Sequence, residues 1–82
     1  MSELDDLRSG IRAKVLAGHL PKEHCQMTWF GPGRRAICVA CDQVIGPDEV
    51  EVECDLPKGG GTIRFHQRCY KVWVAEWPTC GV

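Results

Sequence analysis

The chain has 82 residues, of which 10 are basic and 11 acidic, so its formal net charge is −1. This length allows one domain, close to the limit at which an apolar core suffices, and the balanced charge disfavours a nucleic-acid binder with one broad basic face. No stretch is long and apolar enough to span a bilayer, and the acidic N-terminal sequence MSELDDLRSG lacks the order of a secretory signal. We therefore expect a cytoplasmic protein, in which six cysteines indicate metal binding rather than disulfides.

An amphipathic helix is predicted over residues 3–17. Its apolar stripe at helical spacing consists of Leu4, Leu7, Ile11 and Val15. Ser2 and Asp5 form an N-terminal capping signal, and Gly18 and Pro21 mark the end of the helix. We expect the stripe to pack on the rest of the chain, with a partner-binding helix as the alternative.

Residues 19–37 are predicted to form a connector that contains the turn sequence GPGRR. Trp29 and Phe30 precede this turn. We expect both side chains to pack at the margin of the core rather than to form a stacking platform.

A half-buried strand is predicted over residues 49–55, EVEVECD, because polar and apolar residues alternate strictly. Val50, Val52 and Cys54 share one face, and Glu49, Glu51, Glu53 and Asp55 share the other. The glycine-rich loop LPKGGG and the short strand TIRF follow, which together predict a β-hairpin. Residues 38–57 hold six acidic and no basic residues, so the hairpin should carry an acidic face.

The last predicted element is a helix over residues 66–77, which Pro78 is expected to stop. Its large apolar stripe is formed by Tyr70, Trp73, Val74 and Trp77 and is typical of a core-facing helix. The elements divide into residues 1–35, a helix and connector, and residues 36–82, a compact unit. We expect both parts to form one folded unit.

Four potential metal ligands stand at regular spacing. Cys38 and Cys41 are separated by two residues, and so are His66 and Cys69. Three thiolates and one imidazole form a closed tetrahedral set that is typical of structural zinc. A tight turn can direct the first pair to one point, and positions i and i+3 of a helix can direct the second pair there. We therefore predict one structural Zn²⁺ at these four residues.

The order of this zinc knuckle, the hairpin and a helix with ligands in its first turn resembles a treble-clef zinc finger. In ligand types it is similar to the first half of a LIM domain and to the fingers of poly(ADP-ribose) polymerases, which also place an aromatic residue, here Phe65, before the histidine. It also resembles small bacterial proteins with a short N-terminal helix, a GPG turn and such a finger. The resemblance covers residues 36–77 and implies a treble-clef-like α+β fold. Val72 stands where a LIM domain continues with another cysteine.

Three cysteines lie outside the motif. Cys54 falls on the apolar face of its strand and is expected to be a buried thiol, and Cys80 is expected to be exposed. Cys25 follows His24 in the connector. We expect all three to be reduced bystanders; the alternative is a second metal site made of His19, His24, Cys25 and Cys80.

No sequence pattern indicates an enzyme, since His66 is committed to metal and no nucleophile or carboxylate pair has a recognisable setting. We predict a protein-interaction or adaptor module with two contact surfaces, the turn WFGPGRR and an acidic face at Glu49, Glu51 and Glu53 that attracts a basic protein partner. One alternative is nucleic-acid binding through Arg34, Arg35, Lys58, Arg64, Arg68 and Lys71, with Trp29 available for stacking. Another is a redox sensor whose thiolates release zinc on oxidation.

Overall fold

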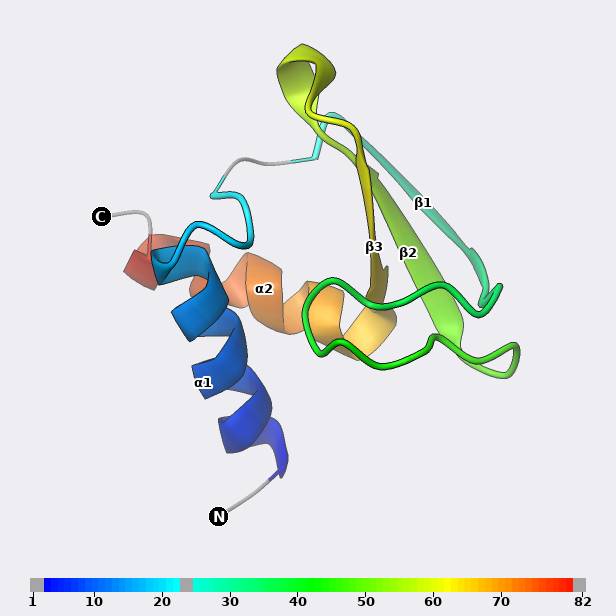
Figure 1. Cartoon of the computed structure of the whole chain (residues 1–82), viewed down its shortest axis with the longest axis horizontal. Helices are drawn as coiled ribbons and strands as arrows, with labels where there is room; N and C mark the ends of the chain where they lie inside the picture. Colours follow the sequence, from blue (N-terminus) through cyan, green and yellow to red (C-terminus); the bar gives the residue numbers. More distant parts are fainter. Residues whose placement is uncertain (1–2, 23–24, 81–82) are drawn as a thin grey trace.

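The computed structural model describes residues 3–22 and 25–80, with side chains over 5–22 and 25–76. Its elements are α1 (Glu3–Leu16), β1 (Met27–Pro32), β2 (Val50–Asp55), the short 3₁₀ turn η1 (Pro57–Gly59), β3 (Thr62–His66) and α2 (Gln67–Cys80). The strands form an antiparallel sheet in the order β1-β2-β3. Helix α2 leaves the end of β3 and α1 crosses it, so the two helices lie to one side of the sheet (Figure 1). The protein is thus a small α+β domain, and neither helix is long and apolar enough to cross a membrane.

Helix α1 ends one residue before the predicted boundary, at a glycine cap. Gly18 has a φ of 83°, a left-handed conformation that glycine adopts at no steric cost. Its N–H donates to the carbonyl of Val15 at 3.1 Å, and the N–H of His19 donates to the carbonyl of Lys14 at 2.8 Å. These two bonds form a Schellman motif, which satisfies carbonyls that the end of a helix leaves unpaired.

The apolar stripe of α1 faces the core, as predicted. Ile11 and Val15 are buried and Leu7 packs against the same cluster. The predicted cap at Ser2 and the side chain of Leu4 lie outside the described residues.

A buried acidic side chain joins the two helices. Glu76 is only 2 % exposed, and its two carboxylate oxygens lie 3.1 Å from Arg8 Nε and 2.9 Å from Arg12 Nη2. These arginines hold the pKa of Glu76 below its usual range, with the hydrogen bond from Arg12 the largest cause. The role of Glu76 was not predicted, because one acidic residue beside an apolar stripe has no local signature in the sequence.

The predicted hairpin is confirmed as β2 and β3, with Glu51 opposite His66 and Cys54 opposite Ile63. Strand β1, however, was missed: residues 27–32 were assigned to a connector, and they pair with β2 along its whole length, with Trp29 opposite Glu53. The segment MTWFGP ends in two strand-disfavouring residues and shows no polar alternation. Its strand is stabilised by pairing with β2, which local sequence does not reveal.

The expected packing of Trp29 and Phe30 at the core margin is wrong. Trp29 is 55 % exposed and Phe30 is 60 % exposed. Phe30 makes one edge-to-face contact with Tyr70 of α2, at a centroid distance of 6.1 Å.

The polar face of β2 is less exposed than alternation predicts. Glu51 is 2 % exposed, since two basic side chains flank it. Its carboxylate accepts the backbone N–H of Arg34 at 3.3 Å and lies 3.6 Å from Arg64 Nε. A buried carboxylate requires such partners.

Helix α2 differs from its prediction at both ends. It begins at Gln67 rather than at His66, and it continues through Pro78 to Cys80. A proline in the last turn removes only one helical hydrogen bond, so it does not force the helix to stop there. The predicted core role of the helix is confirmed at Trp73, which is fully buried and stacks on Phe65 at 4.9 Å; the side chain of Trp77 lies outside the described residues.

Candidate metal centre

Cys38 and Cys41 lie in a tight turn between Ile37 and Val44, which form an isolated antiparallel bridge. Asp42 closes the turn: its φ is 65° and its N–H donates to the carbonyl of Cys38 at 2.9 Å. Aspartate tolerates this left-handed conformation better than most residues. The turn therefore works as the predicted knuckle and directs both sulfurs to one side.

Two contacts fix the knuckle against the rest of the fold. The N–H of Val39 donates to the carbonyl of Arg64 in β3 at 2.9 Å. Lys14 of α1 donates from Nζ to the carbonyl of Val39 at 2.9 Å and to Asp42 Oδ2 at 2.8 Å. The N-terminal helix thus contacts the candidate site directly, which the sequence did not indicate.

The second ligand pair comes from the junction of β3 and α2. His66 is the last residue of β3, and Cys69 lies in the first turn of α2. The prediction that both residues share a helix face is therefore wrong in detail. The change of direction at the junction still brings both side chains to the knuckle.

The four predicted residues come together. One ligand atom from each of Cys38, Cys41, His66 and Cys69 lies within 4.8 Å of all the others. Nδ1 of His66 is 3.3 Å from the sulfur of Cys41 and 3.9 Å from that of Cys69. Tetrahedral coordination with metal–sulfur bonds of about 2.3 Å and metal–nitrogen bonds of about 2.1 Å gives ligand–ligand edges of about 3.5–3.8 Å. The cluster therefore has the dimensions to hold a metal ion.

The orientation of the imidazole supports this interpretation. Nδ1 of His66 faces the sulfurs, while Nε2 lies 3.2 Å from the carbonyl of Val44 and 3.4 Å from Glu49 Oε1. A second hydrogen bond of this kind fixes the tautomer and ring orientation of a metal-binding histidine. Val44 and Glu49 were not linked to the site by the sequence, since nothing in their spacing relates them to His66.

Burial and electrostatics favour a cation between the sulfurs. Cys38 and Cys69 are fully buried and His66 is 2 % exposed. A hydrogen bond between the two thiols lowers the pKa of Cys38 to about 4 and raises that of Cys69, and burial raises the pKa of Cys41. A cation between the sulfurs would favour the charged form of all three thiols.

The predicted reduced state of Cys25 and Cys54 is contradicted, because these residues form a disulfide. Cys54 is buried, as expected, but it is not a free thiol. The alternative second metal site fails with it, since Cys25 is not available as a thiolate; His24 and the side chain of Cys80 lie outside the described residues. Within the described side chains, the group at Cys38 is the one set of three or more His, Cys, Asp or Glu residues that can hold a metal ion.

Comparison of the chain with family models, curated proteins and solved structures finds no match.

Proposed function

We propose that Cys38, Cys41, His66 and Cys69 bind one structural Zn²⁺. The observation that carries this proposal is the convergence of three sulfurs and one imidazole within 4.8 Å. This donor set suits zinc in a reducing or neutral environment and leaves no coordination position for a substrate. The proposed role is therefore structural, and we propose no catalytic activity.

The arrangement of knuckle, hairpin and helix around the ligands supports a treble-clef zinc finger as the finer description of the fold. The ligands come from the turn after residue 37 and from the β3–α2 junction. The N-terminal helix is then an addition that Lys14 attaches to the knuckle.

We further propose that the zinc-bound fold serves as a protein-interaction or adaptor module. Two exposed aromatic side chains on an edge strand, Trp29 and Phe30, support this role. A cytoplasmic location stays a prediction. It requires that the Cys25–Cys54 bond persist or form under cytoplasmic conditions, where most disulfides are reduced.

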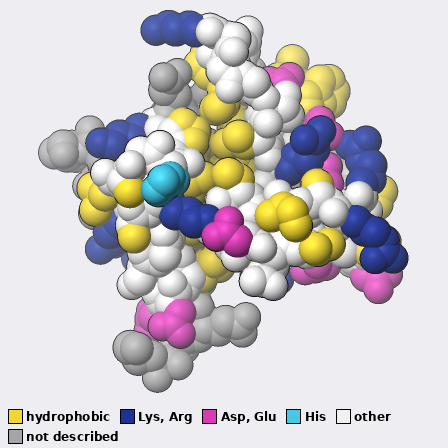
Figure 2. Space-filling view, viewed as in Figure 1, with side chains coloured by type: hydrophobic (Ala, Val, Ile, Leu, Met, Phe, Trp, Pro, Cys, Tyr) yellow, Lys and Arg dark blue, Asp and Glu magenta, His cyan; other side chains and the backbone are white. Residues whose placement is uncertain are grey.

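Ion pairing favours a protein partner over the nucleic-acid alternative. Arg34 and Arg64 pair with Glu51 and Glu53, and Arg68 lies 3.4 Å from Glu49. Figure 2 shows basic and acidic side chains interspersed on the viewed face rather than gathered into one basic patch. A phosphate backbone would meet carboxylates at these places.

Native mass spectrometry of the untagged protein, purified without chelators, tests the zinc proposal. We expect a mass increase equal to one Zn²⁺ per chain and its loss on acid denaturation. Metal-free protein with Cys38 bonded to Cys41 would contradict the proposal.

Titration with short single-stranded and double-stranded nucleic acids at low salt tests the nucleic-acid alternative. A salt-dependent affinity would overturn the preference for a protein partner.

A further inference from the structure

Strand β1 presents backbone groups that β2 does not use. The N–H of Gly33 donates to the carbonyl of Glu49 at 2.9 Å, directly after the strand. Because hydrogen-bonded positions alternate in an antiparallel pair, Gly31 and Trp29 also face β2. The N–H and C=O groups of Thr28 and Phe30 therefore point away from the sheet. In the described part of the chain, no strand lies along this outer edge.

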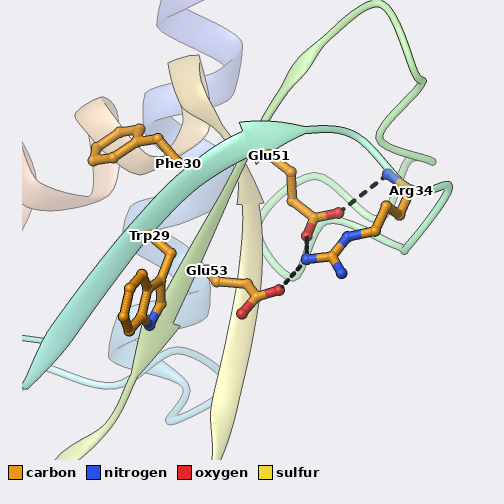
Figure 3. Close-up of a pocket in the computed structure, with 5 residues that line it drawn as sticks. All are labelled: Trp29, Phe30, Arg34, Glu51 and Glu53. Atoms are coloured by element: carbon orange, nitrogen blue, oxygen red, sulfur yellow. Dashed lines mark hydrogen bonds and ion pairs between the residues drawn. The ribbon is translucent and has the colours of Figure 1, made fainter.

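Exposed aromatic side chains flank this edge. Trp29 and Phe30 leave β1 on opposite sides (Figure 3). An extended segment added beside β1 would place its alternating side chains against one ring on each face. This is the geometry of peptide recognition by strand addition, in which backbone bonds give affinity and side-chain contacts give specificity.

A pocket of about 240 Å³ adjoins the edge and is lined by Trp29, Phe30, Arg34, Glu51 and Glu53. It already contains the guanidinium group of Arg34, and Nε of Arg64 lies 3.6 Å from Glu51 Oε2 and 3.7 Å from Glu53 Oε1. Arg34 Nη2 lies 2.5 Å from Glu53 Oε1 and 3.5 Å from Glu51 Oε2 (Figure 3). Arg34 is nevertheless 71 % exposed, so exchanging its side chain for another guanidinium disturbs little of the fold.

We propose that the β1 edge binds an extended peptide segment as a fourth strand, and that an arginine of this peptide enters the pocket and displaces the guanidinium of Arg34 from Glu53. The carboxylates of the pocket complement an arginine, whose planar group can form paired hydrogen bonds with them. This inference rests on the proposed role as a protein-interaction module and names its partner.

A second copy of the chain fits the edge less well. The segment that would pair, residues 25–32, has the sequence CQMTWFGP and contains no basic residue. Two β1 strands side by side would therefore bring no arginine that could take the place of Arg34 beside Glu53 in either pocket. Pro32 also lacks an N–H, which limits continuous edge-to-edge pairing.

The test is a titration of zinc-loaded, ¹⁵N-labelled full chain with the blocked peptide Thr-Val-Arg-Val-Thr, followed by NMR. We expect shifts and slower hydrogen exchange at the amides of Thr28 and Phe30. Replacing the arginine of the peptide by citrulline should weaken binding by about tenfold, since a charge-assisted hydrogen bond is lost. Methylating the peptide nitrogens that face β1 should abolish binding.

Two variants of the protein distinguish binding in the pocket from a general effect of the protein's charge. Glu53→Gln should weaken binding, whereas Arg34→Ala should strengthen it, because the peptide arginine then has no ion pair to displace; only Arg64, 3.7 Å away, still pairs with Glu53. Lys58→Ala, an exposed change at the hairpin loop, is the matched control and should leave the affinity unchanged. The two modified peptides need no change to the protein, so they keep the test valid if a variant fails to fold.

The proposal is overturned if the amides of Thr28 and Phe30 do not respond, if citrulline binds as well as arginine, if Arg34→Ala weakens binding, or if the chain dimerises through β1. Native mass spectra of the same samples distinguish failure of the β1-edge proposal from failure of the zinc proposal. A protein that keeps one zinc and does not bind contradicts the edge proposal alone, and a folded protein without zinc contradicts the proposed metal site.

Discussion

The cysteines at the two ends of the sheet differ: one end holds a cluster that could bind a metal ion, and the other carries a disulfide. At one end of the sheet, His66 lies opposite Glu51 in the strand register and belongs to the candidate metal cluster. Toward the other end, Cys54 lies opposite Ile63 and forms a disulfide with Cys25. The metal ligands lie in two local pairs, each set by a turn or a chain junction. The disulfide joins residues 29 positions apart. A local spacing motif therefore reveals the candidate metal cluster, whereas the disulfide depends on the path of the chain before β1.

Removing a metal ligand should have the largest effect. We expect Cys38→Ser to abolish metal binding and the cooperative unfolding transition, because structural zinc contributes about 10 kcal/mol or more to the folding of small zinc domains. This exceeds or equals the total stability of most domains of this size. Metal content and thermal unfolding by circular dichroism, with and without a chelator, measure the effect.

Cys80→Ser is the control for this substitution, since it removes a thiol outside the C-x2-C…H-x2-C motif. It should retain one metal ion and its thermal transition. A metal-depleted wild-type protein that unfolds at an unchanged temperature would show that the cluster does not stabilise the fold.

Breaking the disulfide should have a smaller effect and should spare the metal centre. Closing a loop of 29 residues stabilises a fold by about 3.6 kcal/mol in the chain-entropy account, so Cys25→Ala should lower the free energy of unfolding by about that amount. Denaturant unfolding measures the change, and metal analysis should still find one ion per chain. Reduction of the wild type by a phosphine should reproduce the variant.

Two results would contradict the prediction that the disulfide and the metal cluster stabilise the fold independently. If unreduced wild type is alkylated at both Cys25 and Cys54, the bond is absent in solution. If Cys25→Ala also loses the metal ion, the disulfide and the metal cluster are not independent.

The sequence predicts those parts of this protein that depend on local contacts, and it misses those that depend on residues distant in the chain. Helix α1, the β2–β3 hairpin and the metal cluster were predicted, because capping residues, strict alternation and paired spacing are local signals. Strand β1 was missed, and with it the exposure of Trp29, since an edge strand gains its stability from a partner about 25 residues later. The ion pairs of Glu51 and Glu76 were missed for the same reason: their arginine partners are distant in sequence.

A third prediction concerns Glu76, which joins the two helices through its ion pairs with Arg8 and Arg12. Glu76→Gln should lower the free energy of unfolding by about 2 kcal/mol at neutral pH, because hydrogen bonds to charged groups are lost from a buried position. Metal content should be unchanged. Asp6→Asn, at an exposed position of α1, is the control and should have little effect.

The lowered pKa of Glu76 determines how this stability difference should change with pH. The folded-state pKa of Glu76 is lowered, so its contribution is fully present above the unfolded-state pKa and is lost as the pH falls through the folded-state value. The stability difference between wild type and Glu76→Gln should therefore shrink as the solution is acidified below the usual range of a glutamate. A difference that stays constant would mean that the charge of Glu76 is not responsible.

The smallest effect is expected at Glu49, which supports the candidate metal ligand His66. Glu49 accepts the N–H of Gly46 at 2.8 Å and lies 3.4 Å from Nε2 of His66, so it fixes both the loop and the imidazole. Glu49→Ala should weaken metal binding by about tenfold without unfolding the protein, as is typical when an outer partner of a ligand is removed. Competition with a chromophoric chelator measures the affinity. Asp48→Ala, the exposed neighbouring acid, removes the same charge and should leave the affinity unchanged; equal losses in both variants would assign the effect to net charge instead. A loss confined to Glu49→Ala would show that metal affinity depends on the contact that joins the residue before β2 to His66 at the β3–α2 junction.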